Sequence, residues 1–378
     1  MKYMGSKRAM LQNGLGDLLR GAAKGHRRVV DLFCGAASVS WFAAQELGKA
    51  VLATDLQEYA VVLARAVIER DTPLETESLT ESWLEEAREK RKQSRVWCAG
   101  SRLDLARYNA ATWSMRAKEL CAERSNDGGH IWRAYGGHYY SPTQALTLDA
   151  MLSCLPSERI WRSVCLAATV IAASKCAASP GHTAQPFKAN RTAGPFLREA
   201  WLRDPLQCAM GALSLICPRH AVCRGKAQVA DANKVAEHLC SDDLVFVDPP
   251  YSGVHYSRFY HVLETVARGA CGPVEGVGRY PPSDERPASR YSRKTESLGA
   301  ARSLLQSLAR SGCTVVLTFP REACSNGLSG EDVHEVARQS FVVERNAVKT
   351  RFSTLGGNCT IREARKVSDE LMLLLRPR

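Results

Sequence analysis

The stretch 242–251, Asp-Asp-Leu-Val-Phe-Val-Asp-Pro-Pro-Tyr, constrains this chain more than any other. Its run Leu244 to Val247 is apolar without alternation, which is typical of a strand buried on both faces of a sheet. The run ends at Asp248, and the two prolines that follow cannot continue a strand in the middle of a sheet. We therefore expect a carboxylate, two proline carbonyls and an aromatic ring at the carboxyl end of a buried strand, where open α/β sheets bind their ligands.

The quartet Asp248-Pro249-Pro250-Tyr251 fits methyl transfer to an exocyclic amine. The lone pair of an adenine N6 is delocalised into the ring, so this amine is a poor nucleophile. If Asp248 and the carbonyl of Pro249 each accept one N–H bond, the lone pair localises and can attack a methyl sulfonium. Tyr251 offers a face for a base taken out of its stack. An ordinary turn after a strand would have the same composition, so the interpretation depends on the rest of the chain.

Two strand-and-turn units precede this stretch. Residues 29–33 form a buried run, followed by the small residues 34–38 and a helical pattern over 39–47. Such a turn lets a ligand approach the backbone and the helix N-terminus. The next strand, 50–54, ends at Asp55, where an acid would bind the ribose hydroxyls of an adenosine.

A third strand, 227–230, ends at Asp231. A polar residue there could bind the adenine amino group of a nucleoside cofactor, or it could cap the helix expected at 233–239. One side chain can do only one of these well, and the sequence leaves both open. The remaining strands are expected at 314–319, 341–345 and 370–375, the last two in a hairpin-like arrangement.

Four motifs occur in the order of the Dam-like class-α DNA adenine-N6 methyltransferases. They are Lys2-Tyr3-Met4-Gly5-Ser6-Lys7, Asp31-Leu32-Phe33-Cys34-Gly35-Ala36-Ala37-Ser38, Asp55 and Asp248-Pro249-Pro250-Tyr251. The chain resembles this family over residues 1–70 and 226–260. The resemblance implies an α/β fold with a Rossmann-like seven-stranded methyltransferase sheet, S-adenosylmethionine as cofactor, and an adenine flipped out of double-stranded DNA as the target.

The resemblance also assigns roles to residues. Asp248, Pro249, Pro250 and Tyr251 would be catalytic, and Lys7 would lie beside both cofactor and flipped base. The residues expected to bind the cofactor are Tyr3, Met4, Gly5, Lys7, Asp31, Phe33, Gly35, Asp55, Asp231 and Asp248. The family usually has a second glycine where Ala37 stands, and a methyl group there narrows the approach to the cofactor.

We expect residues 71–225 to be an inserted, mainly helical target-recognition domain, and 1–70 plus 226–378 to be the catalytic domain. From Arg88 to Arg224 the chain has 20 Lys and Arg against 9 Asp and Glu, which suits the phosphate backbone of a nucleic acid. The loop 185–191 offers hydrogen-bond donors for base edges. The residues expected to contact DNA are Lys7, Lys188, Asn190, Arg191, Arg290 and Arg351.

Aromatic residues and Gly-rich turns alternate with the basic residues of the insert, which is typical of a surface that follows a phosphate backbone. The aromatic residues are Trp97, Trp113, Trp132, Tyr135, Tyr139, Tyr140, Trp161 and Trp201. Of these we assign Trp161 and Trp201 to the core. We expect 75–92 to be a charged, solvated helix and 270–295 to be a mobile loop that closes over DNA.

The chain of 378 residues has a formal net charge of +12 and an isoelectric point near 9.1, which points to a polyanionic partner. No run approaches the length of a membrane span and the N-terminus lacks an apolar leader, so we expect a cytoplasmic protein. The 14 cysteines are scattered and are expected to be reduced. Cys217, His220 and Cys223 lack a second pair at zinc-finger spacing, so no metal is expected.

Other classes of protein share part of this pattern. An RNA adenine methyltransferase would have the same sheet and quartet, although RNA and protein amide enzymes often have Asn where Asp248 stands. A non-catalytic DNA-binding protein that retains the fold is conceivable because of Ala37, but the intact quartet argues against it. A dinucleotide oxidoreductase would share the first strand, turn and acid, but not Asp-Pro-Pro-Tyr. The resemblance allows an orphan methylase as well as one that works with a cognate endonuclease or with defence-system proteins.

Overall fold

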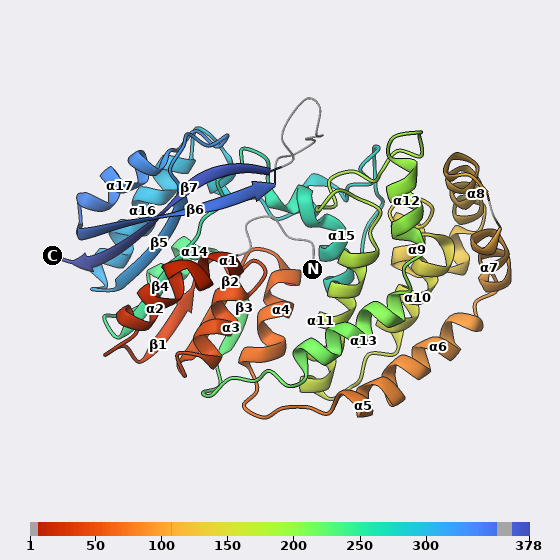
Figure 1. Ribbon diagram of the computed structural model, residues 1–378, viewed down its shortest axis with the longest axis horizontal. Coiled ribbons are helices and arrows are strands. Elements are labelled where there is room, and N and C mark those ends of the chain that lie inside the picture. The colour runs from red at the N-terminus through yellow and green to blue at the C-terminus, as the bar shows by residue number, and fades with distance from the viewer. Residues whose placement is uncertain (1–6, 107, 354–364) are drawn as a thin grey trace. The chain divides into compact units, whose positions relative to one another are not determined.

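The computed structural model describes residues 7–106, 108–353 and 365–378, and within them the chain forms two compact units (Figure 1). The sheet unit consists of the described residues in the ranges Met4–Thr72, His220–Tyr256 and Pro287–Arg378. The helical unit contains Pro73–Arg219 and Ser257–Arg286. Each unit is described by itself.

The sheet unit contains a seven-stranded mixed sheet with the strand order β3-β2-β1-β4-β5-β7-β6. Parallel pairing joins β3 to β2, β2 to β1, β1 to β4 and β4 to β5, whereas β7 is antiparallel to both β5 and β6. The strands are β1 Arg28–Asp31, β2 Ala50–Asp55, β3 Lys226–Val229, β4 Asp243–Val247, β5 Thr314–Pro320, β6 Phe341–Ser353 and β7 Arg365–Pro377. The predicted α/β fold, with a Rossmann-like sheet of seven strands and an antiparallel final pair, is confirmed.

Helices cover both faces of this sheet (Figure 1). On one face, α14, α16 and α17 pack on alternate strand residues such as Val30, Val245 and Val315, all buried in one apolar cluster. The helices α2, α3 and α4 contact the strands outside this cluster. The helices of the unit are α1 Arg8–Met10, α2 Gly16–Ala22, α3 Ser38–Gln45, α4 Glu58–Ile68, α14 Ala232–Ala236, α16 Ser297–Arg310 and α17 Gly330–Arg338, with a π-helical segment at Leu11–Leu15.

The direction in which the strands are added reverses between β1 and β4. The chain runs outward from β1 through β2 to β3 on one side and from β4 to β5 on the other, so the turns that follow β1 and β4 diverge. Such a switch point leaves a crevice at the carboxyl ends of the two strands. Asp31 pairs with Phe246 in the register, which brings the end of β1 beside the segment that leads into Asp248.

The helical unit has an aromatic core of its own. Its helices are α5 Thr76–Leu79, α6 Glu85–Lys92, α7 Trp97–Leu105, α8 Ala110–Glu123, α9 His130–Tyr135, α10 Pro142–Ser153, α11 Arg159–Cys176, α12 Gly194–Trp201, α13 Pro205–Ile216 and α15 Tyr256–Arg268. Trp113, Trp132, Tyr135, Tyr139, Tyr140 and Trp201 are all buried. The prediction that the aromatic residues follow a phosphate backbone is wrong for these positions except Trp201, which we had assigned to the core. The reason is that large aromatic rings supply most of the apolar area that a helical unit must bury.

Two further predictions for this unit fail for related reasons. Trp161, which we had assigned to the core, is 38% exposed near the start of α11. The segment 75–92 is amphipathic and not a solvated helix throughout: Leu79, Trp83 and Ala87 are buried, and Trp83 Nε1 donates to Met151 O at 3.0 Å. The many charged residues of this segment made its apolar residues at helical spacing easy to overlook in the sequence.

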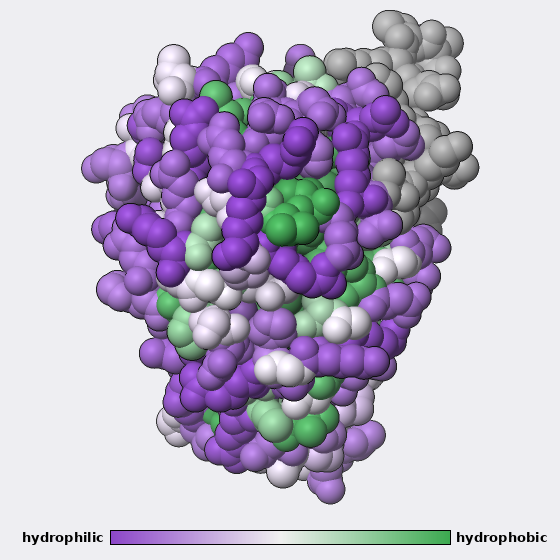
Figure 2. Space-filling view, turned by 90° about the vertical axis from the view of Figure 1, so that its left-hand side faces the viewer, coloured by the Kyte–Doolittle hydropathy of each residue, from purple (hydrophilic) through white to green (hydrophobic). Residues whose placement is uncertain are grey.

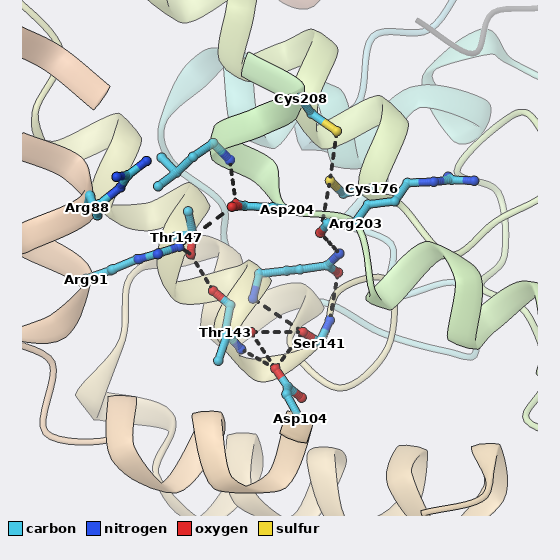
Figure 3. Close-up of polar contacts among 12 residues, drawn as sticks. Arg88, Arg91, Asp104, Ser141, Thr143, Thr147, Cys176, Arg203, Asp204 and Cys208 are labelled. Carbon is cyan, nitrogen blue, oxygen red and sulfur yellow. Dashed lines mark hydrogen bonds and ion pairs between the residues drawn. The ribbon is translucent and has the colours of Figure 1, made fainter. Parts of the chain in front are cut away.

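Partly buried carboxylates link the helices of this unit. Asp104, near the end of α7, accepts hydrogen bonds from Ser141 Oγ at 2.8 Å and Thr143 N at 3.0 Å at the start of α10 (Figure 3). Its other oxygen accepts from Trp113 Nε1 of α8 at 2.9 Å. Asp149 likewise accepts from the backbone of Gly129, where an added Cβ would lie 2.4 Å from its Oδ1. The Gly128-Gly129 turn therefore serves close packing.

Residues 257–286 pack with the helical unit, although our sequence interpretation placed them in the catalytic domain. Thr183 N donates to Phe259 O at 2.6 Å, and both Tyr139 Oη and His261 Nε2 lie 2.9 Å from Gly278 O. Arg279 Nε donates to Ala134 O at 2.8 Å. The segment that we expected to be a mobile loop is thus held in this part by buried polar contacts.

The face of the sheet unit on the side of α16 and α17 is mostly hydrophilic, with hydrophobic side chains visible in a few small areas (Figure 2). Among the described residues, no helix is long and apolar enough to cross a membrane.

Candidate active site

The quartet follows a fully buried strand of the sheet, β4. All five residues of β4 are buried, and β4 pairs in parallel with β1 on one side and β5 on the other. The predicted buried strand before Asp248 is therefore confirmed. It ends where the prolines begin, so Asp248 lies at the carboxyl edge of the sheet, between the ends of β1 and β5.

Two donors converge on one oxygen of Asp248. Thr318 Oγ1, from the next strand β5, donates to Asp248 Oδ1 at 2.9 Å. The ammonium of Lys7 lies 2.9 Å from the same Oδ1. Within the described ranges, no hydrogen bond or ion pair reaches Oδ2. The carboxylate is 16% exposed, so it is held in a fixed orientation with one oxygen left to accept another donor.

Lys7 is shared between two carboxylates. It immediately precedes the short helix α1 and is 4% exposed. Its ammonium lies 2.6 Å from Glu370 Oε1 on β7 and 2.9 Å from Asp248 Oδ1. Burial disfavours its charged form, but the carboxylates outweigh burial and raise the pKa of Lys7 above its usual range. Burial also raises the pKa of Asp248 to about 6; Lys7 opposes this rise and Glu370 adds to it.

The rest of the quartet is held by the segment after β5. Asn326, which is fully buried, donates from Nδ2 to Pro250 O at 3.1 Å and to Tyr291 O at 3.0 Å. The ring of Tyr251 packs edge-on against Phe319 with 6.4 Å between centroids. Pro249 is buried and directly follows Asp248. These contacts fix the direction of the backbone that carries the proline carbonyls.

Asp31 ends β1 in an unusual environment. It is 1% exposed, and its Oδ2 accepts from Ser40 Oγ at 2.6 Å. Its Oδ1 is buried and has no hydrogen-bond partner in the part of the chain that the structure describes. Burial raises the pKa of Asp31 to about 7; the Ser40 hydroxyl opposes the shift, and the nearby charge of Asp248 adds to it. A buried acceptor without a partner is costly in a folded protein, and such atoms often mark ligand sites.

The turn after β1 and the end of β2 are joined by one carboxylate. Gly35 N donates to Asp55 Oδ2 at 3.0 Å, and Gln57 N donates to Asp55 Oδ1 at 3.0 Å. Gly35 has φ +48°, and Ala37, the N-cap of α3, has φ +59°. The left-handed backbone at Ala37 explains why a glycine would suit this position, because a Cβ costs about 1 to 2 kcal/mol there.

The other residues that we predicted to bind the cofactor contact neighbouring side chains or backbone, or lie outside the described residues. Asp231 caps α14, and its Oδ1 accepts from Asn233 N at 2.9 Å and Lys234 N at 3.3 Å. Of its two alternatives the capping role is therefore seen, and the cofactor role stays a prediction. Phe33 packs edge-on against Tyr291 at 5.2 Å. Tyr3, Met4 and Gly5 lie outside the described residues.

The predicted DNA contacts are scattered. Lys188, Asn190 and Arg191 are exposed on one loop of the helical unit, where Asn190 Oδ1 accepts from Ala193 N at 2.8 Å before α12. Arg290 belongs to the sheet unit, is 51% exposed and lies 3.7 Å from Glu296 Oε2. The side chain of Arg351, within β6, is not described, and Lys7 is buried in its ion pairs.

Sequence reasoning missed three residues that support the quartet: Thr318, Asn326 and Glu370. Thr318 lies on the strand next to β4, so a hydroxyl near its carboxyl end could have been noticed from the predicted strand 314–319. Glu370 begins the apolar run of β7 and pairs with Pro320 in an antiparallel register. Only the pairing of β7 with β5 brings it to Lys7, and the sequence does not reveal that pairing.

Comparison with known proteins adds an independent result. Residues 3–96 and 218–275 match the model of the D12 class N6 adenine-specific DNA methyltransferase family. One relative, "Modification methylase StsI" of Streptococcus sanguinis, is 28% identical over 120 residues, which cover 32% of this chain and 17% of the relative. The match thus spans only a small part of the relative's length. The chain is similar to the D12 class N6 adenine-specific DNA methyltransferases across both segments that carry its motifs, and the resemblance predicted from those motifs is confirmed.

Proposed function

We propose that this protein transfers a methyl group from S-adenosylmethionine to the exocyclic N6 of an adenine in double-stranded DNA, with the base flipped onto the quartet Asp248 to Tyr251. The observation that carries the proposal is the hydrogen bonding of Asp248. Lys7 and Thr318 both bind Oδ1 at 2.9 Å, which leaves Oδ2 as the acceptor for an N–H of the target amine. The family match over 3–96 and 218–275 supports the same chemistry.

The residues of the β1 and β2 ends fit the cofactor. The buried Oδ1 of Asp31, which has no hydrogen-bond partner among the residues that the structure describes, suits the ammonium of a methionine moiety. Asp55 accepts the backbone N–H groups of Gly35 and Gln57, which fixes its carboxylate at the end of β2, where an acid can accept hydrogen bonds from ribose hydroxyls. The left-handed turn at Gly35 brings backbone close to this edge. When bound there, S-adenosylmethionine supplies an electrophilic methyl group on its sulfonium.

The chain's own residues then perform three tasks. Asp248 Oδ2 and the carbonyl of Pro249 accept the two N–H bonds of N6, which localises its lone pair toward the methyl group. Tyr251 stacks on the base and excludes water from it. After transfer the nitrogen is cationic, and its proton passes to Asp248 Oδ2. A carboxylate with a pKa of about 6 is strong enough for this step, because the methylated ammonium is a strong acid.

We assign recognition of the DNA sequence to the helical unit and chemistry to the sheet unit. The exposed Lys188 and Arg191 on the loop before α12 support this division, as does the excess of basic residues between Arg88 and Arg224. A role in a restriction–modification system, beside a cognate endonuclease, is supported by the name of the relative, a modification methylase. The overall charge of +12 suits association with DNA.

The test uses purified protein, S-adenosylmethionine labelled in its methyl group, and a pool of duplex DNA, with single-stranded RNA of the same sequences in parallel. After digestion to nucleosides, mass spectrometry is expected to find the label in N6-methyldeoxyadenosine and not in RNA. Label in RNA alone would instead establish an RNA methyltransferase. Folded protein that binds the cofactor and labels neither would establish a non-catalytic protein.

Two variants control this experiment. Asp248→Ala removes the proposed acceptor. Asp242→Ala removes an exposed carboxylate just before the same strand. The backbone carbonyl of Asp242 accepts a hydrogen bond from Arg27 N at 2.9 Å, and this bond does not depend on the side chain. We expect Asp242→Ala to methylate DNA like the wild type and Asp248→Ala to be slower by about two orders of magnitude or more.

A further inference from the structure

We propose that Glu370 is a positioning residue of the methyl-transfer site, which shares the ammonium of Lys7 with Asp248 and thereby keeps Asp248 a strong hydrogen-bond acceptor. The inference rests on the proposed function. It concerns a residue on β7, more than a hundred positions after the quartet in the sequence and outside the segments 3–96 and 218–275 that match the family model.

Glu370 lies where the last strand of the sheet meets the site. It is 1% exposed, and in the register it pairs with Pro320 of β5 and with Val348 of β6. β5 also supplies Thr318, which donates to Asp248. The antiparallel pairing of β7 with β5 therefore brings Glu370 to Lys7, with 2.6 Å from Glu370 Oε1 to Lys7 Nζ.

The numbers of positive and negative side chains around Lys7 are unequal, and this affects how strongly Asp248 accepts hydrogen bonds. One ammonium, Lys7, serves two buried carboxylates, and all three side chains are at most 16% exposed. If Asp248 alone were paired with Lys7, the ammonium would stabilise its negative charge more strongly. The carboxylate would then be less basic and a weaker hydrogen-bond acceptor. Glu370 takes part of the ammonium's hydrogen-bonding capacity and adds a negative charge of its own.

Other groups around Asp248 act in known directions. Thr318 donates to it and stabilises its charged form, whereas the carboxylate of Asp31 interacts with it repulsively. Burial raises the pKa of the Cys324 thiol, and the charge of Glu370 adds to this rise. Within the described residues, Glu370 is the carboxylate that contacts Lys7 directly besides Asp248. Its removal should therefore change Asp248 more than removal of a more distant charge would.

A purely structural ion pair is the competing explanation, because a buried Lys–Glu contact also ties the start of α1 to the sheet. The two explanations differ in their effect on pH dependence. If Glu370 only holds the fold, its replacement lowers the stability and leaves the pH profile of the reaction in place. If it positions the charge of Lys7, its replacement lowers the pKa of Asp248, so the ionised acceptor persists to lower pH.

The experiment compares Glu370→Gln with the wild type and with the matched control Asp369→Asn. Asp369 is the preceding residue on β7, is 37% exposed and lies 3.6 Å from Arg321, so its variant removes one negative charge from the same strand without touching Lys7. Single-turnover methylation of DNA is measured from pH 5 to pH 9, together with KM for DNA and for S-adenosylmethionine and with thermal unfolding.

For Glu370→Gln we expect the acid limb of the rate profile to move down by about one pH unit. The plateau rate should fall by about three- to tenfold, because a less basic carboxylate is a weaker acceptor, with both KM values unchanged within about twofold. Asp369→Asn should keep the wild-type profile. An acid limb of Glu370→Gln at the wild-type pH would overturn the proposal. If this variant does not fold, Glu370→Asp decides instead, because the shortened side chain withdraws from Lys7: a downward shift supports the proposal and an unmoved limb overturns it.

A second readout separates failure of this inference from failure of the proposed function. The carboxyl carbon of Asp248 is followed by NMR in protein labelled at aspartate, with Asp248→Asn to assign its signal. If the wild type methylates no adenine, the proposed function fails, and the titration of Asp248 in Glu370→Gln still tests the charge sharing. If the wild type is active and the Asp248 titration is the same with and without Glu370, only the present inference fails.

Discussion

Replacement of Asp248 by asparagine should be at least as damaging as replacement by alanine, although asparagine is nearly isosteric. Lys7 Nζ and Thr318 Oγ1 both approach Oδ1 at 2.9 Å, and both are donors. The asparagine carbonyl must therefore take the place of Oδ1, which puts its NH₂ group where Oδ2 was. A donor then faces the N–H of the target amine.

The loss of rate in Asp248→Asn follows from this exchange of an acceptor for a donor. A lost hydrogen bond to a charged acceptor is worth about 1.5 to 3 kcal/mol, and leaving a buried donor opposed to another donor costs about 1 to 3 kcal/mol more. The sum lowers the rate by about two to four orders of magnitude. Rotation of the side chain gives no escape, because it would turn NH₂ toward the ammonium of Lys7.

The assay is single-turnover methylation of a duplex substrate, with affinity for S-adenosylmethionine measured by calorimetry. We expect Asp248→Asn to be no faster than Asp248→Ala and to bind the cofactor within about threefold of the wild type, since the charge is removed from the acceptor side. A rate for Asp248→Asn within tenfold of the wild type would refute the assignment of Oδ2 as the acceptor.

Three further changes test other parts of the site. Asp55→Ala should weaken S-adenosylmethionine binding by about 1.5 to 3 kcal/mol, and unchanged affinity in calorimetry would remove Asp55 from the cofactor site. Ala37→Gly relieves about 1 to 2 kcal/mol of left-handed strain but loses a buried methyl group worth about 0.8 kcal/mol, so chemical denaturation should find stability raised by about 0.2 to 1.2 kcal/mol. Calorimetry should find equal or tighter cofactor binding, and weaker binding would contradict this account of the turn. Neutralising Lys188 or Arg191 to Gln should lower the salt slope of DNA binding by about one if the side chain meets a phosphate, or relax discrimination at one position by about 1 to 3 kcal/mol if it meets a base edge. The control is Lys24→Gln, at an exposed site of the sheet unit. If both loop variants bind DNA as this control does, the loop does not contact the DNA.

The sheet could be predicted from the sequence because buried parallel strands carry a strong local signal. The apolar run of β4 and its break at two prolines fix both the strand and the position of Asp248. The acid Asp55 likewise marks the end of β2. Local chemistry offered two roles for Asp231, a helix cap and a cofactor contact, and the structure shows the cap.

The errors arise where a residue's environment depends on distant pairing. An aromatic residue near basic residues fits a nucleic-acid surface or a core equally well, and only tertiary packing decides: Trp132 is fully buried, whereas Trp161 is 38% exposed. The contact between Lys7 and Glu370 joins residues near the two ends of the chain, and it depends on the antiparallel pairing of β7 with β5. Such contacts leave no periodic signal in one sequence.

The most direct test of the central claim is sequencing of genomic DNA for modified bases after expression of this chain in a host that lacks DNA methylation. We predict N6-methyladenine at a defined sequence motif in cells that express the wild type and in cells that express Asp242→Ala, and none in cells that express Asp248→Asn. Genomic adenines that stay unmodified although the folded wild-type protein is present would contradict the claim, and so would methylation that persists with Asp248→Asn.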